Sequence, residues 1–333
     1  MISSPTVDFA PPGIADIEQA AERIQGQAVL TPLLESPALN RIVGGRVLVK
    51  PEVLQRTGSF KFRGAYNCIS RISASARKAG VVAFSSGNHA QGVAAAAKML
   101  GAPATIVMPS DAPAIKVEST RAWGAEIVLY DRAKEDRDAI ARGIARKQGA
   151  SVVPPFDHPH VIAGQGTIGL EIARQLAALG ATADAVVVPC GGGGLIAGTS
   201  LALKHALPGV PVYAAEPQGY DDTTRSLRSG HREQARAGAK SFCDALLAPM
   251  PGELTFSINR RTLAGGYAVS DAEVAGAMAT AFVHLKLVIE PGGAVALAAV
   301  LTGKLDARAR TVVVVCTGGN VDPGVFAAAL NFS

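Results

Sequence analysis

The sequence predicts an α/β protein with two parallel-sheet domains. Short runs rich in Val and Ile alternate with Ala-rich segments along the 333 residues, and this alternation is typical of parallel sheets with crossover helices. A chain of this length has room for about two domains. Its 48% of hydrophobic residues suffices for large cores, and its 36 glycines suit many tight turns between strands and helices.

The individual elements are predicted from local patterns. Ile14, Ile17, Ala21 and Ile24 recur with helical spacing and predict an early amphipathic helix. A second helix is expected over residues 195–205. Short apolar runs, rich in β-branched residues, predict strands over residues 47–49, 81–84, 105–108, 127–130, 151–153, 185–188, 212–215 and 311–315.

Composition and charge favour a cytoplasmic protein over a membrane, secreted or nucleic-acid-binding one. The longest uncharged stretch, residues 185–203, is interrupted by Pro189 and four glycines, so it does not predict a membrane span. The N-terminus lacks a basic segment followed by an apolar core, and no signal peptide is expected. Basic residues are dispersed despite a net charge of +5, which disfavours nucleic-acid binding. The cysteines lack C-x-x-C spacing and are expected to be free, buried thiols: Cys68, Cys190, Cys243 and Cys316.

Lys61 lies in the segment QRTGSFKFRGA, residues 55–65. A lysine amine can form a Schiff base with an aldehyde cofactor when its pocket keeps part of its population unprotonated. A lone lysine is more often a solvated surface residue, so Lys61 alone would predict little. Three further motifs supply the rest of a pyridoxal phosphate site and change that interpretation.

The next motif is Ser85-Ser86-Gly87-Asn88-His89, which lies between an apolar run and an Ala-rich segment. It predicts a polar loop that joins a strand to a helix. Such a loop directs backbone N–H groups and small hydroxyls beyond the strand end, where a carboxylate can bind at a helix N-terminus. A helix N-cap would explain one of these residues but not all five. We therefore expect this loop to bind the substrate carboxylate.

Four consecutive glycines, Gly191 to Gly194, follow another predicted strand and precede the helix over residues 195–205. Without Cβ atoms the backbone can adopt positive φ and turn several amides toward one anion, which predicts a phosphate-binding cup. A flexible linker is the alternative, but the flanking buried elements argue against it. Neither G-x-G-x-x-G with its following acidic residue nor G-x-x-x-x-G-K-[ST] fits well, which disfavours a nucleotide site.

The last motif, Thr317-Gly318-Gly319-Asn320, follows the predicted strand 311–315. We expect Thr317 to face the cofactor ring. A neutral hydroxyl leaves a pyridine nitrogen largely unprotonated, whereas a carboxylate would hold it as pyridinium. The weaker electron sink suits elimination of a β-substituent better than transamination. Alone, Thr317 would be interpreted as an ordinary strand-end turn.

With these four motifs in this order, the chain resembles the fold-type II pyridoxal phosphate enzymes, which have a tryptophan synthase β-like architecture. Within them it is most similar to the threonine/serine dehydratase and serine racemase branch. Thr317 stands where that branch more often has Ser, and the hydroxyl is retained. The resemblance implies a small domain over residues 54–157, a large domain over 1–53 and 158–333, and the cofactor in the cleft between them.

The resemblance also assigns roles to individual residues. It implies that Lys61 is the Schiff-base lysine, that Asn88 contacts the ring hydroxyl of the cofactor, and that the glycine tetrad holds the phosphate. The Thr317 hydroxyl would contact the pyridine nitrogen. Ser86 corresponds to a serine on the opposite ring face, the second acid/base in racemases. A racemase needs proton donors on both faces of a planar carbanion, so Ser86 permits racemisation without establishing it.

Acidic residues in two regions of the chain extend the resemblance. Metal-activated members of the branch bind Mg²⁺ or Ca²⁺ through positions that match Glu216, Asp222 and the Tyr220 carbonyl, and oxygen ligands suit such a cation. The alternative is a pair of solvated acidic residues at a strand end. The branch also has an acidic residue near the cofactor at the position of Glu290, although a first-turn Glu before Pro would explain it without chemistry.

The resemblance implies dehydration and deamination of L-threonine or L-serine to 2-oxobutanoate or pyruvate and ammonia. Three alternatives stay open: a serine racemase, a dehydratase of another β-hydroxy amino acid such as 3-hydroxyaspartate, and a non-catalytic cofactor-binding protein. Side-chain selectivity depends on pocket shape, which these motifs do not report. A homodimer acting on a small amino acid is expected. Because 13 residues follow Asn320, a C-terminal regulatory domain is not expected.

Overall fold

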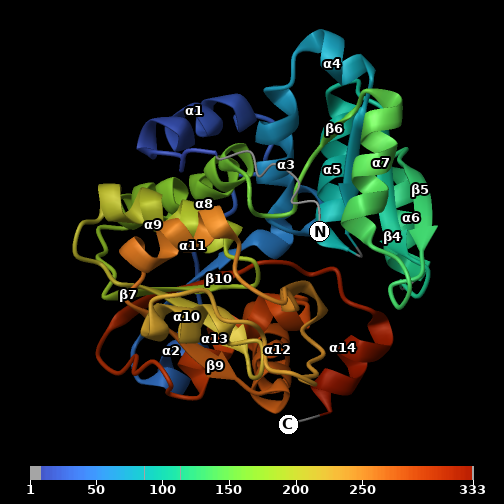
Figure 1. The fold of residues 1–333 in the computed structure, drawn as a ribbon. Helices are drawn as coiled ribbons and strands as arrows, with labels where there is room; N and C mark the ends of the chain where they lie inside the picture. The colour runs from blue at the N-terminus through green and yellow to red at the C-terminus, as the bar shows by residue number, and fades with distance from the viewer. Residues whose placement is uncertain (1–8, 86, 113, 332–333) are drawn as a thin grey trace.

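The computed structural model describes residues 9–85, 87–112 and 114–331 and contains two β-sheets flanked by helices (Figure 1). The larger sheet has the order β1-β2-β10-β7-β8-β9, and the smaller has the order β5-β4-β3-β6. All pairs are parallel except β1 with β2. The strands are β1 (Leu34–Glu35), β2 (Arg46–Pro51), β3 (Val81–Phe84), β4 (Ala104–Pro109), β5 (Glu126–Tyr130), β6 (Ser151–Val152), β7 (Ala185–Pro189), β8 (Val212–Pro217), β9 (Gly265–Val269) and β10 (Thr311–Cys316).

The α-helices lie between the strands in chain order and cover the sheets, as crossover connections of parallel strands require. They are α1 (Ile14–Ile24), α2 (Pro37–Val43), α3 (Lys61–Ser70), α4 (Ala74–Lys78), α5 (Asn88–Met99), α6 (Ala114–Ala122), α7 (Arg137–Gln148), α8 (Pro159–Ala178), α9 (Gly194–Ala206), α10 (Asp222–Ser229), α11 (Glu253–Thr262), α12 (Asp271–Leu285), α13 (Pro291–Leu301) and α14 (Pro323–Leu330).

One helix on each sheet is almost entirely buried. Helix α13 is apolar on all sides, which is typical of a helix inside a core, and its residues Pro291 to Val300 are buried against the larger sheet. Helix α5 is rich in alanine, and its first ten residues are buried between the smaller sheet and α3. Both helices begin at residues beside the cavity described below, so the cores hold the site in place.

The predicted elements agree with this fold. All eight predicted strands are present, as are the early amphipathic helix, α1, and the helix after the glycines, α9. Two strands were missed, because β1 has only two residues and β9 begins with two glycines and lacks a β-branched run. The four strands of the smaller sheet lie within residues 54–157. The domain limits themselves stay a proposal.

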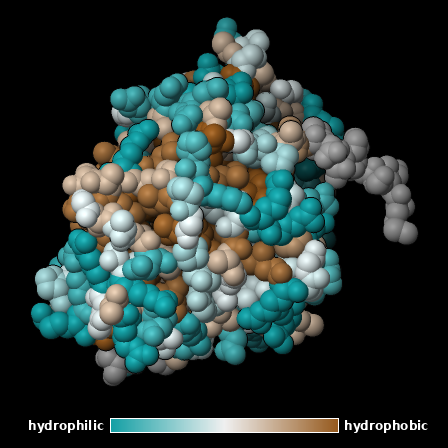
Figure 2. Space-filling model, turned by 90° about the vertical axis from the view of Figure 1, so that its left-hand side faces the viewer, coloured by the Kyte–Doolittle hydropathy of each residue, from teal (hydrophilic) through white to brown (hydrophobic). Residues whose placement is uncertain are grey.

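The surface and the thiols fit the composition. Figure 2 shows one face of the molecule, on which hydrophobic side chains gather in a central band and hydrophilic ones surround it. Among the described residues, no helix is both long and apolar enough to cross a membrane. All four cysteines are free and buried, which confirms their prediction.

Candidate active site

A cavity of about 160 Å³ is lined by loops that follow strands of both sheets. Ligands of open α/β sheets usually bind at such strand ends. The cavity brings together most of the residues predicted from the motifs: Lys61, Ser85, Gly87, Asn88, His89, Gly191, Gly192, Gly193, Gly194 and Thr317. Ser86 lies outside the described residues.

Lys61 is the first residue of α3 and is half-buried in the cavity wall. Its Nζ donates a hydrogen bond of 2.7 Å to the Pro155 carbonyl oxygen and lies 5.1 Å from the centre of the Phe60 ring. Burial lowers the pKa of the amine to about 8, against the opposite effect of the Glu290 carboxylate. About a tenth of the Lys61 amine is therefore unprotonated at pH 7, and that is the form that reacts with an aldehyde.

The segment that carries Lys61 is held against the end of β10. Ser59 pairs with Gly318 in an antiparallel bridge, and the Phe60 N–H donates a hydrogen bond of 3.1 Å to the Thr317 carbonyl oxygen. These contacts place Lys61 beside Thr317, although the two residues are far apart in the sequence. Thr317 is itself buried.

Asn88 and Glu290 meet at the N-termini of α5 and α13. The Asn88 side-chain amide donates a hydrogen bond of 2.5 Å to Glu290 Oε1. Burial raises the pKa of Glu290 to about 7, and Asp244 adds to the rise. The Oε2 atom of Glu290 is buried and has no hydrogen-bond partner in the described part of the chain. Glu290 thus lies in the site, and although it is the N-cap residue of α13, its side chain makes no capping hydrogen bond.

The glycine tetrad forms a cradle at the N-terminus of α9. Gly193 has φ of 91°, a left-handed conformation that favours glycine. A Cβ on Gly192 would clash with the Phe156 ring. Below the loop, Thr255 Oγ1 donates a hydrogen bond of 2.7 Å to the Gly192 carbonyl oxygen. Backbone N–H groups at a helix N-terminus beside such a cradle suit a phosphate.

His89 contributes a buried, neutral ring. Its Nε2 lies 2.9 Å from the Val153 carbonyl oxygen, which makes that nitrogen the donor and links α5 to the segment after β6. Burial, together with the nearby Lys61 amine, lowers the pKa of His89 to about 3. With the ring bound in this way, His89 would meet a substrate carboxylate through its backbone N–H.

Three charged residues in the cavity wall belong to no motif and were missed. Lys116 of α6 forms an ion pair with Asp244, a residue of the segment before α11. The Arg137 guanidinium lies 5.5 Å from the centre of the Phe84 ring, and no described carboxylate pairs with it. Arg137 is the first residue of α7, where the sequence suggests an ordinary solvated helix start. No local signal could have found it.

The predicted cation ligands lie between β8 and α10. The Glu216 carboxylate accepts hydrogen bonds from the Thr223 and Thr224 N–H groups, both at 2.8 Å, and from the Thr224 hydroxyl. Burial raises the pKa of Glu216 to about 8 and that of Asp222 to about 7. The Oδ2 atom of Asp222 is buried without a described hydrogen-bond partner. No three described His, Cys, Asp or Glu residues form a metal-ligating group, so a site would need the Tyr220 carbonyl.

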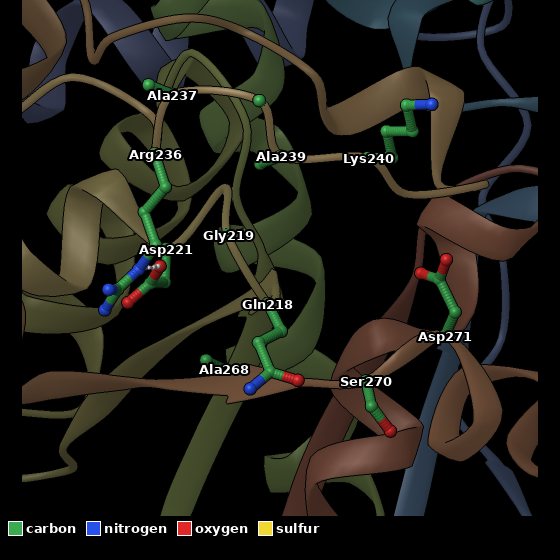
Figure 3. Close-up of a pocket in the computed structure, with 11 residues that line it drawn as sticks. Gln218, Gly219, Asp221, Arg236, Ala237, Ala239, Lys240, Ala268, Ser270 and Asp271 are labelled. Atoms are coloured by element: carbon green, nitrogen blue, oxygen red, sulfur yellow. Dashed lines mark ion pairs between the residues drawn. The ribbon is translucent and has the colours of Figure 1, made fainter.

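A second cavity, of about 690 Å³, borders the same loop (Figure 3). Asp221 lies beside Arg236 there, with 3.5 Å between Oδ1 and Nε. Asp271 accepts hydrogen bonds from Ser241 Oγ at 2.6 Å and from a backbone N–H. The acidic groups of this cavity therefore already have protein partners. Its lining includes none of the predicted motif residues, although Asp221 adjoins the predicted ligand Asp222.

The residues of the first cavity fit pyridoxal phosphate. The lowered pKa of Lys61 suits its aldehyde. The cradle of Gly191 to Gly194, where added Cβ atoms would collide with neighbouring protein atoms, suits its phosphate. Thr317 offers a hydroxyl at the end of β10 for the ring nitrogen. The motifs predicted independently along the chain therefore converge in one place.

Comparison with known proteins agrees with this site. A family model described as "Pyridoxal-phosphate dependent enzyme" matches residues 24–318. An L-threo-3-hydroxyaspartate ammonia-lyase of Pseudomonas sp is 45% identical over 95% of this chain and 97% of that protein. A serine racemase of Schizosaccharomyces pombe is 40% identical over 93% of this chain and 95% of that protein. An L-threonine ammonia-lyase of Thermotoga maritima is 42% identical over 96% of this chain and 78% of that protein.

Solved structures give the same result. A threonine deaminase of T.th. is 41% identical, with a TM-score of 0.88 over 93% of this chain and 99% of that one. Maize serine racemase is 34% identical, with a TM-score of 0.90 over 97% of this chain and 98% of that one. Both neighbours share the fold-type II architecture predicted from the motifs. This chain therefore belongs to the pyridoxal-phosphate dependent enzyme family and is a fold-type II member of it.

Proposed function

We propose that this protein is an ammonia-lyase that removes the hydroxyl group and then the amine from a β-hydroxy-α-amino acid. The products would be a 2-keto acid and ammonia. The observation that carries this proposal is the buried Lys61 amine, with its lowered pKa, in the same cavity as the glycine cradle. The bound cofactor would supply the electron sink that acidifies the α-proton of the substrate.

The residues of the chain would supply binding, orientation and proton transfer. Lys61 Nζ would take the α-proton, because it is a buried amine whose pKa of about 8 is close to neutral pH. Backbone N–H groups of residues 87–89, at the start of α5, would bind the α-carboxylate. The rings of Phe60, Phe84 and Phe156 line the cavity and would exclude water.

For the substrate we propose 3-hydroxyaspartate ahead of threonine and serine. Its second carboxylate needs a cation in the cavity wall. Lys116 is already paired with Asp244, whereas Arg137 has no described carboxylate partner. An Arg guanidinium binds a carboxylate in a bidentate geometry. Relatives from Pseudomonas sp and Saccharomyces cerevisiae, 45% and 42% identical, are named L-threo-3-hydroxyaspartate ammonia-lyase, which supports this choice.

The proposed function is tested by keto acid release from L-threo-3-hydroxyaspartate, L-threonine and L-serine, with chiral analysis of the remaining amino acid. We expect oxaloacetate to form fastest. Faster keto acid release from threonine or serine would overturn the choice of 3-hydroxyaspartate as substrate, but the protein would still be an ammonia-lyase. A D-isomer without keto acid would make the protein a racemase. A protein that binds the cofactor but leaves all three substrates unchanged would be the non-catalytic alternative.

Arg137→Gln should separate the substrates. Loss of a charged hydrogen bond costs about 1.5–3 kcal/mol, so kcat/KM for 3-hydroxyaspartate should fall roughly 10- to 100-fold. For L-serine it should change less than about twofold, because serine has no second carboxylate. Arg142→Gln is the matched control, since Arg142 lies on the same helix and pairs with Asp138 at an exposed site. Equal losses on both substrates would refute the role of Arg137.

We also propose a divalent cation at Glu216, Asp222 and the Tyr220 carbonyl. A cation would offset the burial that raises the pKa of both carboxylates, and would give Asp222 Oδ2 a partner. Mg²⁺ or Ca²⁺ at ten times its Kd should raise the Tm of EDTA-treated protein by about 2 °C. Asp222→Asn should lose that rise, and the exposed control Asp306→Asn should keep it. An unchanged Tm in the parent protein would exclude the site. The homodimer and the cytoplasmic location stay predictions.

A further inference from the structure

Asn320 makes two hydrogen bonds from one nitrogen atom, just outside the cavity wall. Its Nδ2 donates to the Thr57 carbonyl oxygen at 2.8 Å and to Asn88 Oδ1 at 2.7 Å. Asn320 is not among the residues that line the cavity. Of its two hydrogen-bond partners, Asn88 lines the cavity and Thr57 does not, so Asn88 connects Asn320 to the site.

The direction of this chain of hydrogen bonds is set at Thr57. A backbone carbonyl can only accept, so the Asn320 amide must present its NH₂ group there. The same NH₂ group reaches Asn88 and requires the carbonyl oxygen of the Asn88 amide to face it. The NH₂ group of Asn88 is then directed to the other side, where it donates to Glu290 Oε1 at 2.5 Å.

The backbone that presents the Thr57 carbonyl is unusual. Thr57 has φ of 64°, a left-handed conformation that non-glycine residues rarely adopt. The next residue, Gly58, has φ of 69°, and a Cβ there would lie 2.7 Å from Asn320 Oδ1. The turn that precedes Lys61 is thus shaped around the Asn320 side chain. The turn also pairs with the segment after β10, where the Gly319 N–H donates to the Gly58 carbonyl oxygen at 2.9 Å.

We propose that Asn320 is a positioning residue that orients the Asn88 amide, so that the ring hydroxyl of pyridoxal phosphate meets an N–H donor and not a carbonyl oxygen. The proposal rests on the proposed function and on the family resemblance, which implies that Asn88 contacts that hydroxyl. An amide can rotate to exchange its donor and acceptor ends. The Glu290 carboxyl beside Asn88 does not by itself fix the orientation, because a carboxyl group accepts when ionised and can donate when protonated. Asn320 removes that ambiguity from the other side.

Asn320→Asp tests the proposal with little change in volume. The new carboxylate accepts and cannot donate, so the Asn88 amide should turn its NH₂ group toward it and its oxygen toward the cofactor. We expect the Kd for pyridoxal phosphate to rise about 10- to 100-fold, as when a polar group faces the wrong partner. The visible absorption band of the bound cofactor should also shift, since it reports the protonation of the ring hydroxyl.

Asn320→Ala is a second variant, which tests the proposal even if Asn320→Asp does not fold. It removes the donor without adding an acceptor, so its Kd should lie between those of the parent and Asn320→Asp. The surface control Asn331→Asp should bind as the parent does, because Asn331 is exposed at the end of α14. Melting curves of the apo proteins would separate a loss of stability from a loss of affinity.

A double-mutant cycle decides whether Asn320 acts through Asn88. In an Asn88→Ala background, Asn320→Ala should cause less than about a twofold further loss of affinity, because its effect depends on the Asn88 amide. Additive losses, or an unchanged Kd and spectrum in the single variants, would overturn the proposal. A parent protein that does not bind the cofactor would refute the proposed function itself.

Discussion

Replacing Lys61 with alanine should abolish lyase turnover. The substitution removes the amine that binds the cofactor aldehyde and the base that takes the α-proton, and proton transfer by a positioned base alone contributes about 10²–10⁴-fold. We expect kcat to fall by about 10⁴-fold or more. Keto acid release measures the loss, and Lys78→Ala is the matched control, because Lys78 is exposed on α4. Full turnover by Lys61→Ala would refute the mechanism.

The lowered pKa of the Lys61 amine predicts that the rate of cofactor capture by the apo protein depends on pH. With a pKa of about 8, Lys61 in the apo protein is about one-tenth unprotonated at pH 7 and about half unprotonated at pH 8. Only the unprotonated amine attacks an aldehyde, so the rate of cofactor capture should rise with pH and level off above about pH 9. For an ordinary surface lysine, the rate of cofactor capture would instead keep rising beyond pH 10. Stopped-flow absorption of apo protein mixed with pyridoxal phosphate distinguishes the two curves.

The motifs could be predicted because each one combines a strand end with residues that have few other uses. Four consecutive glycines before a helix, or five polar residues after an apolar run, have a local explanation in phosphate and carboxylate binding. The strands were predicted for a related reason, since both faces of a parallel strand are buried and the sequence is continuously apolar. Strand β9 was not predicted, because its two leading glycines have no side chains and its sequence is therefore not continuously apolar.

The residues that were missed share a different property. Arg137, Lys116 and Asp244 reach the cavity from surface-like segments that are far apart in the sequence, and only the tertiary structure brings them together. The Asn320 contact with Asn88 is of the same kind, because both residues lie in sequence motifs but their hydrogen bond depends on tertiary structure. Local patterns therefore predict the chemistry of the site, and long-range packing decides its selectivity and alignment.

A buried network of charges behind Lys61 should dominate the stability of the site. The Arg63 guanidinium is fully buried and binds Glu52 through two hydrogen bonds of 2.8 Å. It also binds Glu171 at 2.6 and 2.9 Å, and Glu171 in turn accepts from the buried Lys50 at 2.6 Å. The network joins α3, which begins at Lys61, to β2, to the 3₁₀ turn of Glu52, and to α8.

Arg63→Met should lower the free energy of unfolding by about 3–5 kcal/mol, the usual cost of leaving a buried charge without its partner. The exposed control Arg308→Met should leave the free energy of unfolding nearly unchanged, because its pair with Asp306 is solvated. Chemical denaturation measures both. A loss below about 1 kcal/mol for Arg63→Met would show that the network contributes little net stability.

The pH dependence of the stability lost in Arg63→Met should identify the cause of that loss. In the parent protein burial opposes ionisation of Glu52, but Arg63 outweighs it and the pKa of Glu52 is lowered. The parent therefore loses this contribution as pH falls through the folded-state pKa. Without Arg63, burial alone should raise the pKa of Glu52, and the variant should gain stability as pH falls. The stability gap should thus be narrower at pH 5 than at pH 7. A gap independent of pH would instead indicate that lost packing of the long side chain causes the destabilisation.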